Sequence, residues 1–256
     1  MAGKPERGAV PPACQREAPP SALPGISPTR GEIGQSRTSH PHQWFGATTY
    51  AQHGDDLAIL NIFKRLGIDT PSYLDVGAYH PFDLSNTALL YERGSRGINV
   101  EPNAVLFQAF RMARPEDINI RAGIAPVSGE LPFYHVDADP GRFTFDKATA
   151  LTLGITFTEP VIVYTPNEIV DGMFCNGVWP DLLSLDIEGL DADVLRAADF
   201  GASPPRVVIV EADNGTGSNA AELAALMAVK GFVLHSWCGS NMIFVRGADQ
   251  ALVWGV

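Results

Sequence analysis

Several acidic residues lie at or just after the ends of short apolar runs. Asp75 precedes Gly77 by two positions, Glu101 closes a second run, and Asp186 and Glu188 close a third. In an open α/β sheet, the carboxyl ends of buried strands form the crevice in which ligands bind. The spacing therefore predicts one polar ligand site built from several strand ends. Asp75 is expected to interact with a ligand ammonium, directly or through water.

The residues around these acids have side chains or backbone properties that suit a nucleotide-like ligand. Gly77 lets the backbone approach the ligand closely, because glycine has no Cβ. Asn86 and Thr87 stand near a predicted helix start, where N–H groups and side-chain polar groups favour a carboxylate. Glu101 is placed to accept hydrogen bonds from two ribose hydroxyls, as the equivalent acid does in dinucleotide folds. The predicted cofactor-binding residues are Asp75, Gly77, Ala78, Asn86, Thr87, Glu101 and Asp186.

A second set of polar residues is a candidate for catalysis. Asp186 and Glu188 are two positions apart and would face the same side of an extended backbone, and Glu211 and Asp213 repeat that spacing. One carboxylate can act as a general base, or the group can bind Mg²⁺ that acidifies a substrate hydroxyl, or the acids only orient a ligand amine. His235 is a further candidate base, because imidazole titrates near neutral pH. The predicted catalytic residues are Asp186, Glu188 and His235; a divalent metal is an alternative, and no metal ligand is assigned.

The elements that must position these residues alternate between strands and helices. Strands are predicted at 73–76, 97–100, 118–122, 182–187, 207–211, 232–236 and 242–246, and helices at about 55–66, 85–93, 104–114, 165–171, 191–199 and 218–230. The last two strands are separated by five residues, too few for a parallel crossover, so the last strand must be antiparallel. This order predicts an α/β fold of the class I methyltransferase (Rossmann-like) type. Its seven-stranded sheet is mostly parallel with an antiparallel last strand and has helices on both faces.

Two segments fall outside this alternation. Residues 131–136 and 161–164 are predicted to form an antiparallel excursion, and the stretch between them, 137–160, has no clear assignment. We expect that stretch to hold a lid or a loop that selects the substrate. Residues 1–43 are rich in Pro, Gly, Ser and Arg and are expected to form a disordered tail. Residues 44–256 are expected to form one catalytic domain.

Composition limits the possible partners. The net charge of −11 disfavours a general nucleic-acid role. No apolar run approaches the roughly 20 residues of a transmembrane helix, and no secretory signal is evident, so no membrane association is expected. The three cysteines are far apart and suggest reduced thiols in a cytoplasmic protein.

Several stretches also occur in an order that is typical of one enzyme family. They are 51–57, 74–78 with Pro81 and 85–87, 91–94, 97–103, 114–117 and 183–191. Through them, over roughly residues 48 to 246, the chain resembles the FkbM family of S-adenosylmethionine (SAM)-dependent methyltransferases. The resemblance implies a class I methyltransferase fold, SAM as methyl donor, and O-methylation of a sugar or natural-product hydroxyl.

Two other functions remain open at the level of sequence. An NAD(P)-dependent oxidoreductase is disfavoured by the antiparallel last strand and by a first turn that is not glycine-rich. A non-catalytic SAM-binding protein would keep the same fold and cofactor residues. For the methyltransferase, the expected partner is a small-molecule or glycan acceptor, and the sequence does not predict an oligomeric state.

Overall fold

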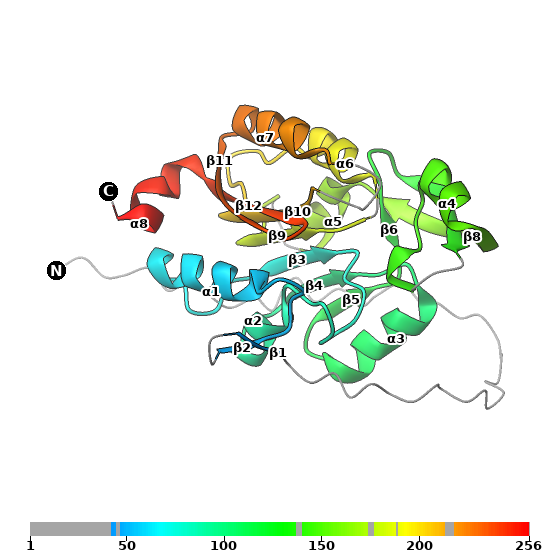
Figure 1. Cartoon of the computed structure of the whole chain (residues 1–256), viewed down its shortest axis with the longest axis horizontal. Helices are drawn as coiled ribbons and strands as arrows, with labels where there is room; N and C mark the ends of the chain where they lie inside the picture. Colours follow the sequence, from blue (N-terminus) through cyan, green and yellow to red (C-terminus); the bar gives the residue numbers. More distant parts are fainter. Residues whose placement is uncertain are drawn as a thin grey trace.

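The computed structural model describes residues 42–44, 47–136, 140–173, 177–187, 189–212 and 218–255. Its centre is a seven-stranded sheet with the order β11-β12-β10-β9-β3-β4-β5 (Figure 1). The strands are β3 (Tyr73–Val76), β4 (Gly97–Val100), β5 (Ile118–Ile120), β9 (Leu182–Leu185), β10 (Val207–Glu211), β11 (Phe232–Cys238) and β12 (Asn241–Arg246). β12 pairs antiparallel with β10 and β11, whereas the strands from β10 to β5 pair in parallel. The predicted mostly parallel α/β sheet with an antiparallel last strand is confirmed.

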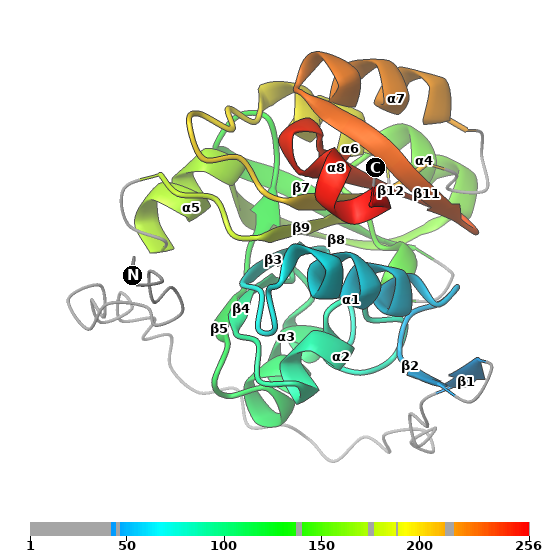
Figure 2. The same ribbon diagram turned by 90° about the vertical axis from the view of Figure 1, so that its left-hand side faces the viewer.

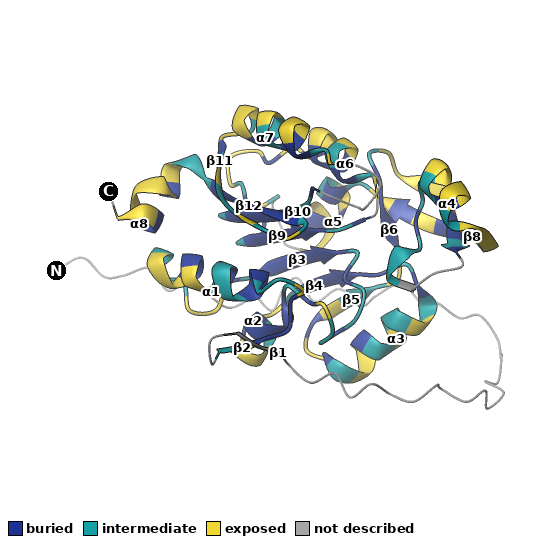
Figure 3. Ribbon diagram, viewed as in Figure 1, coloured by how far each residue is buried: buried dark blue, intermediate teal, exposed yellow. Residues whose placement is uncertain are grey.

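Helices cover both faces of this sheet (Figure 1). On one side lie α1 (Asp55–Leu66), α2 (Ala88–Glu92), α3 (Ala104–Ala113) and α8 (Gln250–Trp254). On the other side lie α5 (Pro166–Met173), α6 (Asp191–Ala197) and α7 (Ala220–Val229). Successive residues of a strand point to opposite faces of the sheet and pack in different helix layers. Tyr73 packs in the core under α1, and Leu74 packs in the core under α6. Burial on both faces explains why the strands are continuous apolar runs (Figure 3).

The ends of several elements differ from the sequence prediction, and two of these differences concern elements next to the ligand site. The helix expected from Ser85 begins only at Ala88, because the Ser85 hydroxyl accepts the Ala88 N–H at 3.1 Å and Thr87 takes the N-cap position. The third strand stops at Ile120 instead of continuing to Ala122. The chain then leaves the large sheet and contributes β6 (Gly123–Ile124) to a second one.

The second sheet contains three strands in the order β6-β8-β7. β7 (Gly129–Val136) and β8 (Ile155–Tyr164) pair antiparallel, which confirms the predicted excursion. Between them lie a 3-10 helix (Pro140–Arg142) and α4 (Lys147–Leu153), which the sequence did not predict. The side chain of Asp146 caps α4 by accepting the Thr149 N–H at 2.7 Å. We call residues 129–164 the insert.

A short hairpin of β1 (His42–Trp44) and β2 (Ala47–Thr49) precedes α1 (Figure 2). The expected tail, residues 1–43, falls almost entirely outside the described residues. Within the described ranges, no helix is long and apolar enough to cross a membrane.

Candidate active site

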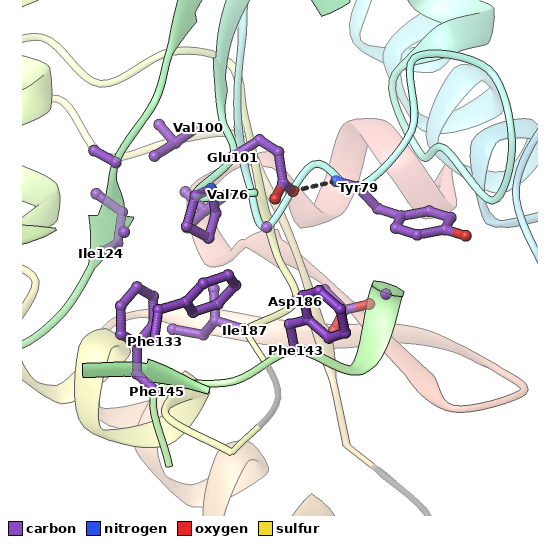
Figure 4. Close-up of a pocket in the computed structure, with 15 residues that line it drawn as sticks. Val76, Tyr79, Val100, Glu101, Ile124, Phe133, Phe143, Phe145, Asp186 and Ile187 are labelled. Atoms are coloured by element: carbon purple, nitrogen blue, oxygen red, sulfur yellow. Dashed lines mark hydrogen bonds between the residues drawn. The ribbon is translucent and has the colours of Figure 1, made fainter. Parts of the chain in front are cut away.

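A pocket lies at the carboxyl edge of the large sheet, between the ends of its central strands and the insert (Figure 4). It is lined by Val76, Gly77, Tyr79, Val100, Glu101, Pro102, Ala122, Gly123, Ile124, Phe133, Gly141, Phe143, Phe145, Asp186 and Ile187. Three of the predicted cofactor-binding residues, Gly77, Glu101 and Asp186, therefore meet in one pocket.

Strand register explains why these three residues meet. The parallel pairing of β3 with β4 and β9 aligns Gly77 with Glu101 on one side and with Asp186 on the other. On the far side of Asp186, the next strand end is that of β10. It carries Glu211, which pairs with Asn241 of β12. A polar row thus continues along the sheet edge beyond the pocket, toward the antiparallel hairpin.

Gly77 occupies a position that other residues do not fit. Its φ of 70° lies in the left-handed region, and an added Cβ would lie less than 3.0 Å from the carbonyl oxygen of Asp186. The Asp186 N–H in turn donates to the Val76 carbonyl at 3.1 Å, so the end of β9 is held against the turn. The N–H groups of Gly77 and Ala78 both donate to the Val100 carbonyl, and Ala78 is buried and does not line the pocket.

Glu101 is held by the same turn. Its carboxylate accepts the N–H of Tyr79 at 2.9 Å and the N–H of Asn103 at 2.7 Å. Burial raises the pKa of Glu101 to about 7, with a smaller contribution from the Asp75 carboxyl, while the two backbone hydrogen bonds oppose the rise. The residue is therefore close to half ionised at neutral pH.

Tyr79 also lines the pocket, although it is not among the predicted site residues. Its φ of 56° is unusual for a residue with a side chain, and this conformation directs its N–H to Glu101 (Figure 4). No residue type encodes that conformation, so it could not be read from the sequence.

Asp75 and Thr87 lie behind the pocket rather than in its lining. Both are buried, and the Thr87 hydroxyl donates to Asp75 at 2.6 Å. Burial raises the pKa of Asp75, and the Thr87 hydrogen bond opposes the rise. Asn86 lies over β9 and donates its amide to the Ser184 hydroxyl at 3.4 Å, but it does not line the pocket either. Contacts of Asp75, Asn86 and Thr87 with a cofactor stay predictions.

A buried arginine connects these elements. Arg114, at the end of α3, pairs with Asp117 at 2.9 Å and donates to Tyr73 Oη at 2.7 Å. Its guanidinium also donates to the Thr87 hydroxyl at 3.0 Å and to the Pro81 carbonyl at 3.4 Å. The network ties β3, the loop after it and the start of α2 to the turn before β5. The signal in the sequence was the spacing of Arg114 and Asp117, which suits an ion pair but does not reveal burial.

Of the other predicted catalytic residues, His235 is described, and it does not line the pocket. His235 is on the edge strand β11, four strands from β3, or about 19 Å at the usual strand spacing. Its Nδ1 lies 3.0 Å from the Ser236 hydroxyl and its ring packs on Trp254, and burial lowers its pKa. Glu188 lies outside the described residues, as does Asp213. Among the residues that are described, no group of three or more His, Cys, Asp or Glu side chains is arranged to hold a metal ion.

A mostly parallel α/β sheet with a ligand pocket at its carboxyl edge is typical of proteins that bind nucleotide-like cofactors. Residues 75–234 match the model of the methyltransferase FkbM domain. Because this match covers more than half of the chain, the protein belongs to the FkbM methyltransferase family, as its sequence motifs predicted.

A solved structure is also similar to the chain. The crystal structure of the methyltransferase FkbM from Methylobacillus flagellatus KT matches with a TM-score of 0.43 and 14% sequence identity. The match covers 70% of this chain and 44% of that one, so it spans less than half of the length of the solved protein. No curated protein matches the chain.

Proposed function

We propose that the protein is a class I, SAM-dependent methyltransferase that methylates a hydroxyl oxygen of a sugar or natural product. The observation that carries the proposal is the meeting of Gly77, Glu101 and Asp186 in one pocket of an FkbM-family fold. The order of the seven strands, with β12 inserted antiparallel between β10 and β11, supports the class I assignment. Family membership also favours this function over an NAD(P)-dependent oxidoreductase.

The pocket has groups that fit the parts of SAM. The two carboxylate oxygens of Glu101 each accept one backbone N–H and keep a lone pair for a ribose hydroxyl. Gly77 leaves the backbone open to close approach, and Asp186 lies beside it to attract the ammonium of the methionine part. Asp75 and Thr87 support this edge from behind, while Ala78 and Asn86 flank it.

Bound SAM would supply an activated methyl group, and this chain would orient the acceptor and hold its proton. The main contribution of the chain would be to position the acceptor oxygen beside that methyl group. The polar row continues from Asp186 to Glu211, so we infer that the acceptor approaches from that side. Asp186 or Glu188 would take the hydroxyl proton. His235 lies on the edge strand β11, outside the pocket lining, and is not assigned this role.

A binding and transfer experiment tests the proposal. Isothermal titration calorimetry of the full chain should detect binding of S-adenosylhomocysteine and no binding of NADH. In a second assay, SAM with a labelled methyl group should label at least one member of a panel of sugars and natural products. NADH binding without S-adenosylhomocysteine binding would reverse the assignment. Tight S-adenosylhomocysteine binding with no transfer across the panel would instead identify a non-catalytic SAM-binding protein.

The titration of Glu101 predicts a pH dependence of cofactor binding. Ribose hydroxyls donate hydrogen bonds to the ionised carboxylate of Glu101. Cofactor binding therefore needs ionised Glu101, which predominates above its pKa of about 7. At pH 6 only about a tenth of Glu101 would be ionised, so affinity for S-adenosylhomocysteine should fall about tenfold between pH 8 and pH 6. Titration calorimetry over this range measures the effect. Glu101→Gln should bind more weakly at pH 8 and lose the pH dependence; an unchanged slope in this variant would contradict the role of Glu101.

The same group predicts the opposite trend for the stability of the free protein. The folded pKa is raised above the ordinary value of 4.5, so the folded state favours the protonated form. The contribution of Glu101 to stability is therefore present below about pH 4.5 and is lost as the pH rises toward 7.

A further inference from the structure

The insert presents three phenylalanines to the pocket. Phe133, on β7, and Phe143 and Phe145, in the segment before α4, all belong to its lining (Figure 4). This segment falls within the stretch for which the sequence predicted only a lid or substrate loop. Its aromatic residues line the same pocket as Glu101 and Gly77.

A backbone bridge aligns the aromatic side chains. Tyr134 and Thr144 exchange both of their backbone hydrogen bonds, at 2.9 and 3.2 Å, so the segment around Thr144 runs beside β7 like a short extra strand. Residues that flank a bridged pair point to the other face from the pair itself. Phe133 therefore meets Phe145, with ring centroids 4.8 Å apart, and lies within 6.1 Å of Phe143. We call Phe133, Phe143 and Phe145 the aromatic wall.

The opposite pocket wall is aliphatic. Val76, Val100 and Ile124 are buried there, and the polar groups Glu101 and Asp186 also belong to the lining (Figure 4). The pocket therefore suits a ligand with a flat, weakly polar end and a strongly polar end.

Gly123 allows the wall to approach the sheet. An added Cβ at Gly123 would lie less than 3.0 Å from the ring of Phe145, so this ring packs directly on the backbone of β6. β6 follows β5, the neighbour of β4, and Glu101 comes directly after β4. The wall is thus held beside the residues that we assign to the ribose.

The Arg121 side chain also links the insert to the sheet. It donates to the Pro102 carbonyl at 3.3 Å and pairs with Glu159 of β8 at 3.0 Å. The other oxygen of Glu159 lies 3.0 Å from Nε2 of His135 on β7. Because these groups are partly exposed, the pair adds little stability, but it connects the insert to the end of β4.

We propose that the aromatic wall binds the adenine base of the methyl donor, so that Phe143 and Phe145 serve donor recognition rather than acceptor selection. The inference rests on the proposed SAM-dependent function and assigns one part of the donor to residues of the insert. Stacking against an aromatic side chain suits a planar base and does not require a specific hydrogen-bond pattern. The adenine would lie between the wall and the aliphatic side of the pocket, with its ribose at Glu101.

Titration calorimetry on Phe143→Ala tests the proposal with ligands that separate the two ends of the donor. Loss of one base–aromatic contact should weaken binding of S-adenosylhomocysteine and of 5′-methylthioadenosine by a similar factor, roughly 10- to 100-fold. Phe143→Tyr should bind both ligands almost as well as the natural chain. Phe157→Ala is the matched control: Phe157 is a phenylalanine of the same insert, 58% exposed and outside the pocket lining, and its removal should leave both affinities unchanged.

The outcomes separate this inference from the proposed function. If Phe143→Ala folds and binds S-adenosylhomocysteine within twofold of the natural chain, the wall does not bind adenine. Unchanged donor affinity with reduced methyl transfer would assign the wall to the acceptor instead, and would also overturn the proposal. If Phe143→Ala unfolds, Phe145→Leu provides a second test, because it keeps an apolar side chain against Gly123. This variant should also weaken the binding of both ligands. Failure of the natural chain to bind S-adenosylhomocysteine at all would refute the proposed function itself.

Discussion

Replacing Gly77 with alanine is expected to destabilise the protein by about 2–5 kcal/mol and to weaken S-adenosylhomocysteine binding at least tenfold. The left-handed backbone at this position costs a residue with a Cβ about 1–2 kcal/mol. The new methyl group would also meet the Asp186 carbonyl, and such overpacking adds about 1–3 kcal/mol. Relief of the contact requires the end of β9 to move, and Asp186 would move with it. For a domain of this size the midpoint of thermal unfolding should fall by about 5–15 °C.

Gly67 provides a matched control for the backbone strain alone. It has the same φ of 70°, at the C-terminal cap of α1, but an added Cβ would meet no atom within 4 Å. Gly67→Ala should therefore cost about 1–2 kcal/mol and leave S-adenosylhomocysteine affinity unchanged. Thermal unfolding and titration calorimetry of both variants give the comparison. Equal effects of the two substitutions would show that the contact between the ends of β3 and β9 is unimportant.

Much of the large sheet was predictable because its strands are buried on both faces. The continuous run Val207–Glu211 was assigned to its observed limits, and the short link before β12 required the antiparallel pairing that the structure contains. Register then follows from parallel pairing, which is why Gly77, Glu101 and Asp186 were predicted to lie at one ligand site and do line one pocket.

The parts that could not be predicted depend on contacts between distant segments. The positive φ of Tyr79 and the aromatic wall arise from the packing of a loop and an insert on the sheet, and no local pattern encodes them. Thr87 has a polar side chain near a helix start, which suggested a ligand contact. Its partners in the folded chain are Asp75 and Arg114, and Arg114 lies 27 positions further on. Sequence patterns reveal that a side chain is polar but not which partner it finds.

Replacing Arg114 with methionine should destabilise the protein by about 3–5 kcal/mol, because it leaves a carboxylate buried without its cation. Arg114 and Asp117 are both completely buried, and the guanidinium also packs over the rings of Tyr73, Tyr91 and Phe110 at 4.9–5.4 Å. Methionine keeps much of the apolar contact, so the loss reports mainly on charge and hydrogen bonds. Chemical denaturation monitored by circular dichroism measures the change.

Arg111 provides the matched control on the same helix. Arg111 is exposed, so Arg111→Met should change the free energy of unfolding by less than about 1 kcal/mol.

A second substitution separates the charge from the hydrogen bonds of the network. In Arg114→Met, Asp117 still accepts hydrogen bonds from Tyr73 Oη, the Gly97 N–H and the Asn99 amide, so its geometry is retained while its charge is uncompensated. Adding Asp117→Asn removes that charge and should recover part of the lost stability, which gives a favourable coupling in the double-mutant cycle. If the two losses simply add, the buried ion pair is not what holds Thr87 and the loop at Pro81 in place. If the two effects couple as expected, the Arg114–Asp117 ion pair orders this edge of the sheet. This pair lies outside the pocket, and Arg114 stands at the end of the helix that follows Glu101.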